Sequence, residues 1–352
     1  MLFLIQRNVV AAEPNILFAI KLAETDMDEP KLFALSATRE FGQAIGEACN
    51  VPLAHHEERT FEDGEYKVRP LETVAGRDVY VVQSLHAGPD LSADDKLNRL
   101  LFFVGALKDS GAAKVTVVAP YLCYARKDRR TKWQDPLTLR YMAALFEAVG
   151  TDAVVTMEIH NDAAFENAFR CRTVPLTAAP LLAQYVKSLG EKHLCVVSPD
   201  PGGVKRAQLF RETIEAACGF PIGRGFVEKR RSAGKVSGDL FVGEAEGATA
   251  LVVDDLIASG GTLLRAARAV RDHGTQKVVA FATHGLFMKG ATEALADPAI
   301  DRVVVCDTVP AFRLPQQHSI RRKLDVISSA GLFAQAILRL HRGERLDDLQ
   351  SF

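Results

Sequence analysis

The chain has 352 residues, of which 48% are hydrophobic and 25% are charged, and these are the proportions of a folded globular protein. Its 43 Lys and Arg residues nearly balance its 44 Asp and Glu residues, and this balance argues against a protein that coats nucleic acid or a membrane surface. The sequence has no apolar run long enough to span a bilayer and no signal-peptide pattern at its start, so we expect a cytoplasmic protein without a membrane segment.

Residues 1–30 end in an acidic, turn-prone stretch, and we expect them to form an extension outside the folded core. From residue 31 onward, short β-branched runs alternate with segments of helical period. Continuous Val, Ile and Leu runs are typical of strands that are buried on both faces of a sheet. The runs predict strands over 78–84, 114–121, 152–160, 193–200, 249–255, 277–285 and 302–308, and the periodic segments predict helices over 97–107, 139–148, 204–217 and 261–273.

Strands that alternate with helices predict an α/β fold with doubly wound, mainly parallel sheets. Three of the predicted strands precede residue 176 and four follow it, so we expect two similar domains, over 31–176 and 177–330. Ligands of such sheets bind beyond the carboxyl ends of the strands. Acids at single strand ends commonly cap helices, but several of them together favour a binding site. The ends in question carry His160, Asp200, Asp254, Asp255 and Asp307.

The segment 250–262 carries the most specific pattern in the chain. A predicted strand runs into two neighbouring carboxylates, and a Ser-Gly-Gly-Thr turn then opens a helix. Successive glycines let backbone N–H groups turn inward, and the helix N-terminus adds positive potential, which suits a phosphate monoester. The paired acids suit vicinal sugar hydroxyls, whereas a plain capped turn has no need of them. The predicted ribose 5-phosphate site therefore comprises Asp254, Asp255, Ser259, Gly260, Gly261 and Thr262.

This segment resembles the phosphoribosyl-pyrophosphate loop of type I phosphoribosyltransferases. Other motifs narrow the resemblance to the ribose-phosphate pyrophosphokinases, also called phosphoribosyl pyrophosphate synthetases. The similarity runs from about residue 31 to about residue 340. It includes the motifs FEDGE (61–65), VVQS (81–84), PYLCYARKDR (120–129), TMEIH (156–160), SPDPGGVKR (198–206), EKRR (228–231) and THG (283–285).

The resemblance implies two phosphoribosyltransferase-like domains, with ATP on the side of the first and a carboxy-terminal helix over 331–345 that packs against that first domain. On the residues alone, 61–65 also fits a tight turn, 126–132 a solvated basic loop, and the histidine at 160 a core residue. The ATP-binding residues that the resemblance implies are Phe61, Asp63, Glu65, Arg126, Lys127, Asp128 and His160.

The resemblance also implies Mg²⁺ as the cofactor, with His160 and Asp200 as the metal-site pair. Imidazole is an unusual ligand for this hard cation, so a contact of His160 with nucleotide phosphates is an open alternative. The implied catalytic residues are Lys229 and Arg231, which precede a Gly- and Ser-containing stretch, 232–238, that we expect to form a loop. Cations on a closing loop can meet charge that develops in the transition state, although a solvated basic loop would look the same.

The activity that the resemblance implies is magnesium-dependent transfer of diphosphate from ATP to the 1-hydroxyl of ribose 5-phosphate, giving phosphoribosyl pyrophosphate and AMP. It further implies a homo-oligomer, a hexamer built from dimers, in which Phe61 reaches a neighbouring subunit's nucleotide. Lys127, Asn161 and Ala258 stand where the family usually has Gln, Ala and Asp. These departures motivate an alternative, a catalytically silent regulatory homologue. A phosphoribosyltransferase is a third reading, which the nucleotide motifs of the first half disfavour.

Overall fold

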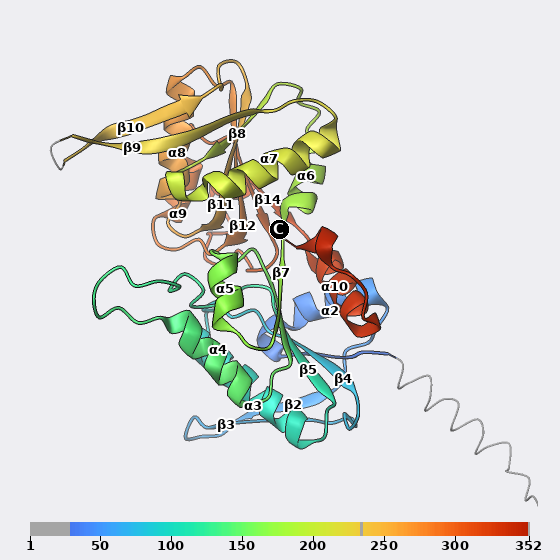
Figure 1. The fold of residues 1–352 in the computed structure, drawn as a ribbon. Coiled ribbons are helices and arrows are strands. Elements are labelled where there is room, and N and C mark those ends of the chain that lie inside the picture. The colour runs from blue at the N-terminus through green and yellow to red at the C-terminus, as the bar shows by residue number, and fades with distance from the viewer. Residues whose placement is uncertain (1–28, 233–234, 351–352) are drawn as a thin grey trace, which may run out of the picture.

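The computed structural model describes residues 29–232 and 235–350, and of residues 229–232 and 235–239 it describes only the backbone. The chain forms two open sheets, each covered by helices on both faces, together with a separate two-stranded hairpin (Figure 1). The predicted extension over 1–30 lies outside the described residues except for Glu29 and Pro30.

The first sheet contains five parallel strands in the order β1-β4-β5-β6-β7. Helices α3, α4 and α5 cover one face, and α2 covers the other together with a helix from the end of the chain. The hairpin β2–β3 lies apart from this sheet. The elements are β1 (Lys31–Ala34), α2 (Arg39–Cys49), β2 (His56–Thr60), β3 (Tyr66–Pro70), β4 (Asp78–Val82), α3 (Ala93–Asp109), β5 (Lys114–Ala119), α4 (Thr138–Ala148), β6 (Ala153–Met157), α5 (Asp162–Ala168) and β7 (Arg172–Leu176).

The second sheet contains seven strands in the order β10-β9-β8-β11-β12-β13-β14, all parallel except β10. Strand order reverses at β8, since the chain moves to β9 on one side and later returns to β11 on the other. The elements are α6 (Ala179–Ser188), β8 (Leu194–Ser198), α7 (Val204–Cys218), β9 (Gly223–Ser232), β10 (Lys235–Gly243), β11 (Thr249–Ile257), α8 (Gly261–Asp272), β12 (Lys277–Gly285), α9 (Ala291–Ala296), β13 (Arg302–Cys306), β14 (Leu324–Ile327) and α10 (Ala330–Arg342).

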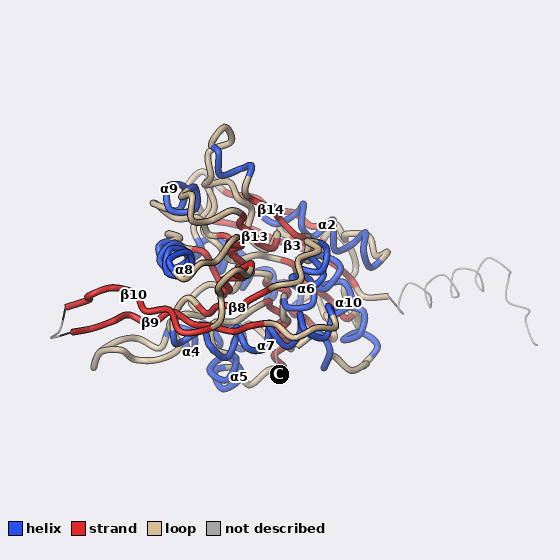
Figure 2. Tube along the Cα trace, turned by 90° about the horizontal axis from the view of Figure 1, so that it is seen from above, coloured by secondary structure: helices blue, strands red, loops and turns tan. Residues whose placement is uncertain are grey.

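The expected α/β fold with mainly parallel sheets is confirmed, and a strand occurs in each of the seven predicted segments. The expectation of a loop over 232–238 is wrong for Ser232 and for residues 235–238, which belong to a long antiparallel hairpin, β9–β10, whereas residues 233–234 lie outside the described residues. The hairpin projects from the molecule in both views (Figures 1 and 2). Pairing between the two strands satisfies the backbone groups that a free loop would leave to water.

The two halves share a continuous hydrophobic core. Side chains of both sheets meet around helices α6 and α7, and α10 returns from the end of the chain to pack against α2 (Figure 1). Phe333 of α10 is fully buried and stacks edge-on against Phe41 of α2, with ring centroids 5.6 Å apart. His341, near the end of α10, lies 2.9 Å from Asp78 at the start of β4. Helix α10 therefore stabilises the first half of the chain through its contacts with α2 and β4.

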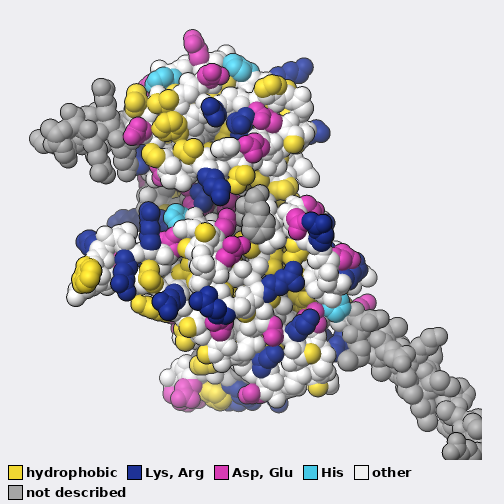
Figure 3. Space-filling model, viewed as in Figure 1, with side chains coloured by type: hydrophobic (Ala, Val, Ile, Leu, Met, Phe, Trp, Pro, Cys, Tyr) yellow, Lys and Arg dark blue, Asp and Glu magenta, His cyan; other side chains and the backbone are white. Residues whose placement is uncertain are grey.

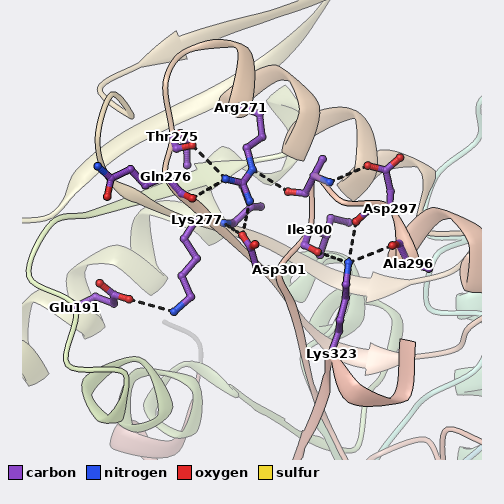
Figure 4. Close-up of polar contacts among 12 residues, drawn as sticks. Glu191, Arg271, Thr275, Gln276, Lys277, Ala296, Asp297, Ile300, Asp301 and Lys323 are labelled. Atoms are coloured by element: carbon purple, nitrogen blue, oxygen red, sulfur yellow. Dashed lines mark hydrogen bonds and ion pairs between the residues drawn. The ribbon is translucent and has the colours of Figure 1, made fainter. Parts of the chain in front are cut away.

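At the edge where the strands of the second sheet begin, several cations hold the backbone in place (Figure 4). Arg271 pairs with Asp301 and donates to the carbonyl oxygen of Gln276 at 2.6 Å. The ammonium group of Lys323 donates to three carbonyl groups, the nearest being that of Ile300 at 2.7 Å. These charges serve the fold, because this edge lies opposite the carboxyl ends where ligands of such sheets bind.

Candidate functional site

A cavity of about 920 Å³ lies between the two halves, beyond the carboxyl ends of strands from both sheets. It lies at the reversal of strand order between β8 and β11, where open α/β sheets bind their ligands. In Figure 3, acidic, basic and histidine side chains gather at the level where the halves meet. The charged and polar residues of its wall include Asp128, Glu158, His160, Asp200, Arg206 and Asp254.

His160 follows β6 and is joined to the second half by a short hydrogen bond. Its Nδ1 donates to Oδ2 of Asp255 at 2.6 Å. The side chain of Asp255 is 7% exposed and that of His160 is 43% exposed. The hydrogen bond therefore joins a buried carboxylate of the sheet to a ring that is partly exposed at the cavity. The hydrogen bond to Asp255 raises the pKa of His160 and favours its imidazolium form.

The two neighbouring carboxylates of β11 have different environments. Burial opposes the ionisation of Asp255, but the hydrogen bond from His160 and the nearby guanidinium of Arg206 outweigh burial and lower its pKa. Burial, followed by the charge of Asp255, raises the pKa of Asp254. Asp255 therefore holds the negative charge, whereas Asp254 readily keeps a proton. Asp254 lines the large cavity, and Asp255 lines a small one beside it.

The structure gives Asp200 and Asp128 local partners within the cavity wall. Asp200 accepts a hydrogen bond from the backbone N–H of Gly203 at 3.0 Å and so caps the short turn before α7. Asn161 donates to Asp128 at 2.8 Å and also caps α5. By contrast, Asp307 accepts from the backbone and hydroxyl groups of Ser329 and fixes the start of α10. Of the acids at the predicted strand ends, Asp307 lines neither the large cavity nor the small one beside it.

The turn predicted to hold the 5-phosphate lies between β11 and α8. Gly260 has a positive φ of 74° and is the N-cap of α8. A Cβ on Gly260 would lie 3.2 Å from Ala294, so this position excludes other side chains by both conformation and space. Ser259 is exposed, while Gly261 and Thr262 begin the helix. These four residues do not line either described cavity.

Other predicted site residues lie at different distances from the cavity. Arg126 lines the small cavity together with His160 and Asp255, and Lys127 is exposed on the following loop. The hairpin β2–β3, whose turn carries Phe61, Asp63 and Glu65, lies at the far end of the first half from the cavity (Figure 1). The predicted catalytic residues Lys229 and Arg231 are in β9, opposite Asp239 and Val236 of β10. The structure describes no side chains there.

The composition of the cavity wall suits a magnesium ion that is held mainly by water and substrate. Among the residues that the structure describes, no three His, Cys, Asp or Glu side chains are grouped as a ready set of ligands. Mg²⁺ commonly takes only one or two protein carboxylates, with water and phosphate oxygens completing its shell. Asp200, Asp254 and Asp128 offer such carboxylates in one cavity.

The structure brings two further residues into the cavity wall, Glu158 and Arg206, which are not among the site residues predicted from the sequence. Glu158 lies in the same motif as His160, and Arg206 lies in the same motif as Asp200. The Nε of Arg206 lies 3.3 Å from Oε1 of Glu158. A carboxylate two residues before the strand-end histidine and a cation near the start of a predicted helix were the available signals, but only the fold shows that they meet.

Comparison with known proteins gives matches along most of the chain. Residues 30–150 match a family model described as the N-terminal domain of ribose phosphate pyrophosphokinase, and residues 228–350 match one described as the phosphoribosyl synthetase-associated domain. In the described part of the chain, no helix is both long enough and apolar enough to cross a membrane.

Individual relatives cover the chain nearly end to end. The ribose-phosphate pyrophosphokinase of Caldanaerobacter subterraneus subsp. tengcongensis is 38% identical over 91% of this chain and 97% of its own length. That of Fusobacterium nucleatum is 34% identical over the same shares. Among solved structures, the phosphoribosylpyrophosphate synthetase from Mycobacterium smegmatis has a TM-score of 0.78 and 29% identity, covering 90% of this chain and 99% of that one.

Proposed function

The chain belongs to the family of ribose-phosphate pyrophosphokinases, and on that basis we propose that it transfers the diphosphate group of ATP to the 1-hydroxyl of ribose 5-phosphate, with Mg²⁺ and with AMP as the second product. The observation that carries the proposal is the shared cavity. Asp128 and His160 of the first half and Asp200 and Asp254 of the second half line one space, although they come from separate motifs.

The second half would bind the sugar. Asp254 and Asp255 would hold ribose hydroxyls, since carboxylate oxygens accept hydrogen bonds from vicinal hydroxyl groups. The 5-phosphate would lie against Ser259, Gly260, Gly261 and Thr262, where the positive end of α8 favours an anion. This assignment is supported by the position of both groups at the end of the same strand, β11.

The first half would bind the nucleotide. Arg126 and Lys127 would meet its phosphates, and Asp128 and His160 would complete the contact from the cavity wall. An imidazolium at His160 is suited to phosphate oxygens because it donates through Nε2 while Asp255 holds Nδ1. The protonation that Asp255 favours supports this phosphate contact over direct metal ligation by His160, since a metal ligand must be a neutral imidazole.

In the proposed transfer, the 1-oxygen of the sugar forms a bond to the β-phosphorus while the bond from that phosphorus to the AMP oxygen breaks. Positioning and charge neutralisation supply most of the acceleration in reactions of this type. Lys229 and Arg231 would stabilise the charge on the transferring group. Asp200 and a neighbouring carboxylate of the cavity wall would hold Mg²⁺, which would neutralise the phosphate charges when bound.

The proposal includes self-association, because the hairpin β2–β3, whose turn carries Phe61, Asp63 and Glu65, lies at the far end of the first half from the cavity (Figure 1). These residues would reach a nucleotide only in a neighbouring copy. Phe61 is 37% exposed, and the guanidinium of Arg59 lies 4.8 Å from the centre of its ring. A cation on one ring face leaves the other face for stacking on adenine.

The experiment that tests this function is incubation of the full chain with ribose 5-phosphate, ATP and Mg²⁺, followed by separation of the nucleotide products. We expect AMP to form in proportion to the sugar diphosphate. Formation of ADP would indicate transfer of a single phosphate and would contradict the proposal. Binding of both ligands without any product would instead favour the silent regulatory homologue that Lys127, Asn161 and Ala258 motivate.

A further inference from the structure

Arg206, near the start of α7, contacts three residues from two segments where the two halves meet. Its Nε lies 3.3 Å from Glu158 and its Nη2 lies 3.8 Å from Oδ2 of Asp255. Nη2 also lies 3.5 Å from the backbone oxygen of His160. Glu158 and His160 follow β6 of the first sheet, whereas Asp255 belongs to β11 of the second. A single guanidinium therefore spans the junction between the proposed nucleotide and sugar sides.

The two acids beside Arg206 are largely buried, so their negative charges need a positively charged partner. The side chains of Glu158 and Asp255 are 13% and 7% exposed, and that of Arg206 is 19% exposed. Burial raises the pKa of Glu158, and the charge of Arg206 opposes that rise. A buried charge that loses its partner is strongly destabilising. The guanidinium is thus fixed by two carboxylates before any substrate arrives.

Glu158 is held in an unusual backbone conformation that strengthens this arrangement. Its φ is +47°, in the left-handed region that residues other than glycine rarely adopt. Its second carboxylate oxygen accepts a hydrogen bond from the backbone N–H of Ala178 at 3.2 Å. Strained residues of this kind persist where the surroundings determine their position, and they cluster at functional sites.

We propose that Arg206 is a positioning residue, which fixes the carboxylate of Asp255, and through it the ring of His160, for the binding of ribose 5-phosphate. The inference rests on the proposed function for its choice of ligand. The planar guanidinium can meet Glu158 and Asp255 together, which a lysine ammonium on a flexible stem cannot do with the same geometry. Asp255 keeps acceptor capacity for a sugar hydroxyl, since a carboxylate offers about four lone pairs.

The competing explanation is that Arg206 only neutralises buried acids and so stabilises the fold. A pair of variants separates the two roles. Arg206→Met alone leaves Glu158 unpaired, and we expect it to lower the thermal unfolding midpoint and to weaken ribose 5-phosphate binding about tenfold or more. The double variant Arg206→Met with Glu158→Gln removes the charges of Arg206 and Glu158 and leaves Asp255 paired with His160, so we expect the midpoint to recover while binding stays weak.

The measurement is calorimetric titration of ribose 5-phosphate into the full chain without nucleotide, alongside thermal unfolding. Arg206→Lys should bind with intermediate affinity. Arg211→Met is the matched control, because Arg211 lies on the same helix but pairs with Glu215 at 2.5 Å outside the cavity. Its affinity should equal that of the wild-type chain.

Two outcomes would overturn the inference while leaving the proposed function standing. One is wild-type affinity in Arg206→Met, and the other is recovery of both stability and affinity in the double variant. Failure of the wild-type chain to bind ribose 5-phosphate would overturn the proposed function, and the inference with it.

Discussion

Two adjacent acids in one strand acquire different protonation behaviour because their side chains meet different neighbours. Asp255 meets His160 and Arg206, which stabilise its negative charge, while Asp254 is buried beside that charge. The two carboxyl groups lie close enough that the charge of Asp255 raises the pKa of Asp254. A carboxyl group with a raised pKa beside an ionised carboxylate can offer a sugar both a donor and an acceptor of hydrogen bonds.

Replacement of Asp255 by Asn should lower the pKa of His160, because the hydrogen bond from His160 to an ionised carboxylate is the main cause of its rise. The protonated fraction of His160 at neutral pH should fall accordingly. The chemical shifts of isotope-labelled histidine rings, followed through a pH titration, measure the effect. An unchanged titration of His160 in Asp255→Asn would show that the contact does not govern its protonation.

Lys229→Ala tests the proposed stabilisation of the transferring group. We expect the rate of product formation to fall by about 10² to 10³, the usual effect of removing one contact to transition-state charge. The affinity for ribose 5-phosphate should stay nearly unchanged, because such a contact forms only as the reaction proceeds. Steady-state kinetics and calorimetric titration measure the two quantities. A collapse of ribose 5-phosphate affinity would assign Lys229 to ground-state binding instead.

At the scale of elements, the turn between β11 and α8 depends on one glycine and tolerates change at the next. Gly260 has a positive φ and close neighbours, whereas a Cβ on Gly261 would lie 3.7 Å from the Ser259 hydroxyl, which is ordinary contact. Gly260→Ala should cost at least about 1 kcal/mol of folding free energy through the strained backbone alone. Gly261→Ala should cost much less.

Denaturant unfolding of these two alanine variants measures the difference directly. Equal stability of Gly260→Ala and the wild-type chain would show that the turn can adopt another conformation. Since Gly260 is the N-cap of α8 and Gly261 is its first residue, the comparison also separates the backbone requirement of the turn from a general intolerance of side chains there.

The apolar runs of the sequence predict the central strands of both sheets but not all of the edge strands. Strands such as β5 and β12 are buried on both faces and therefore carry continuous Val and Ala runs. The short strand β1 and the edge strand β7, which contains Pro175, lack that signal. Within the hairpin β9–β10, the glycine- and serine-containing sequence of 232–238 gives no apolar run and so predicts a loop, although Ser232 and residues 235–238 lie in the two strands.

The sequence predicts the site residues that carry an ionisable side chain and also stand at the end of a predicted strand. His160, Asp200 and Asp254 stand at or near strand ends, and parallel strands bring such ends to one edge. Arg206 does not stand at a strand end, and nothing near it in the sequence indicates a role. Its partners, Glu158 and Asp255, lie 48 residues before it and 49 residues after it. Pairings at that separation depend on how the two sheets pack, which local patterns do not specify.

Across the whole molecule, buried polar contacts join the two halves. His284 of β12 donates from Nε2 to the backbone oxygen of Met157 in β6 at 3.0 Å, and its Nδ1 lies 2.8 Å from the Thr308 hydroxyl. Ser84, after β4, donates to the backbone oxygen of Thr308 at 2.7 Å. These bonds fix the relative position of the sheets, and so hold the two sides of the cavity together.

Burial lowers the pKa of His284 to about 4, which gives a pH dependence of stability. The fold favours the neutral ring, so its contribution is complete above the ordinary histidine pKa near 6.5 and is lost as the pH falls from there towards 4. The loss amounts to about 3 kcal/mol. We expect His284→Gln, which keeps a donor for Met157 but does not titrate, to lose less stability over this range.

Unfolding midpoints of the wild-type chain and His284→Gln, measured between pH 7 and pH 4, test this prediction. Parallel curves for the two proteins would show that the acid sensitivity arises elsewhere, for example at His86, whose pKa burial lowers to about 3.

In the proposed function, one cavity brings the sugar and the nucleotide together. A structure determined with ribose 5-phosphate and the uncleavable analogue α,β-methylene-ATP measures this directly as the distance from the sugar 1-oxygen to the β-phosphorus. We predict a separation of about 3–3.5 Å, the range of a reactive approach, beside His160 and Asp254. Ligands bound at separate surfaces, with no path between them inside the assembly, would contradict the account.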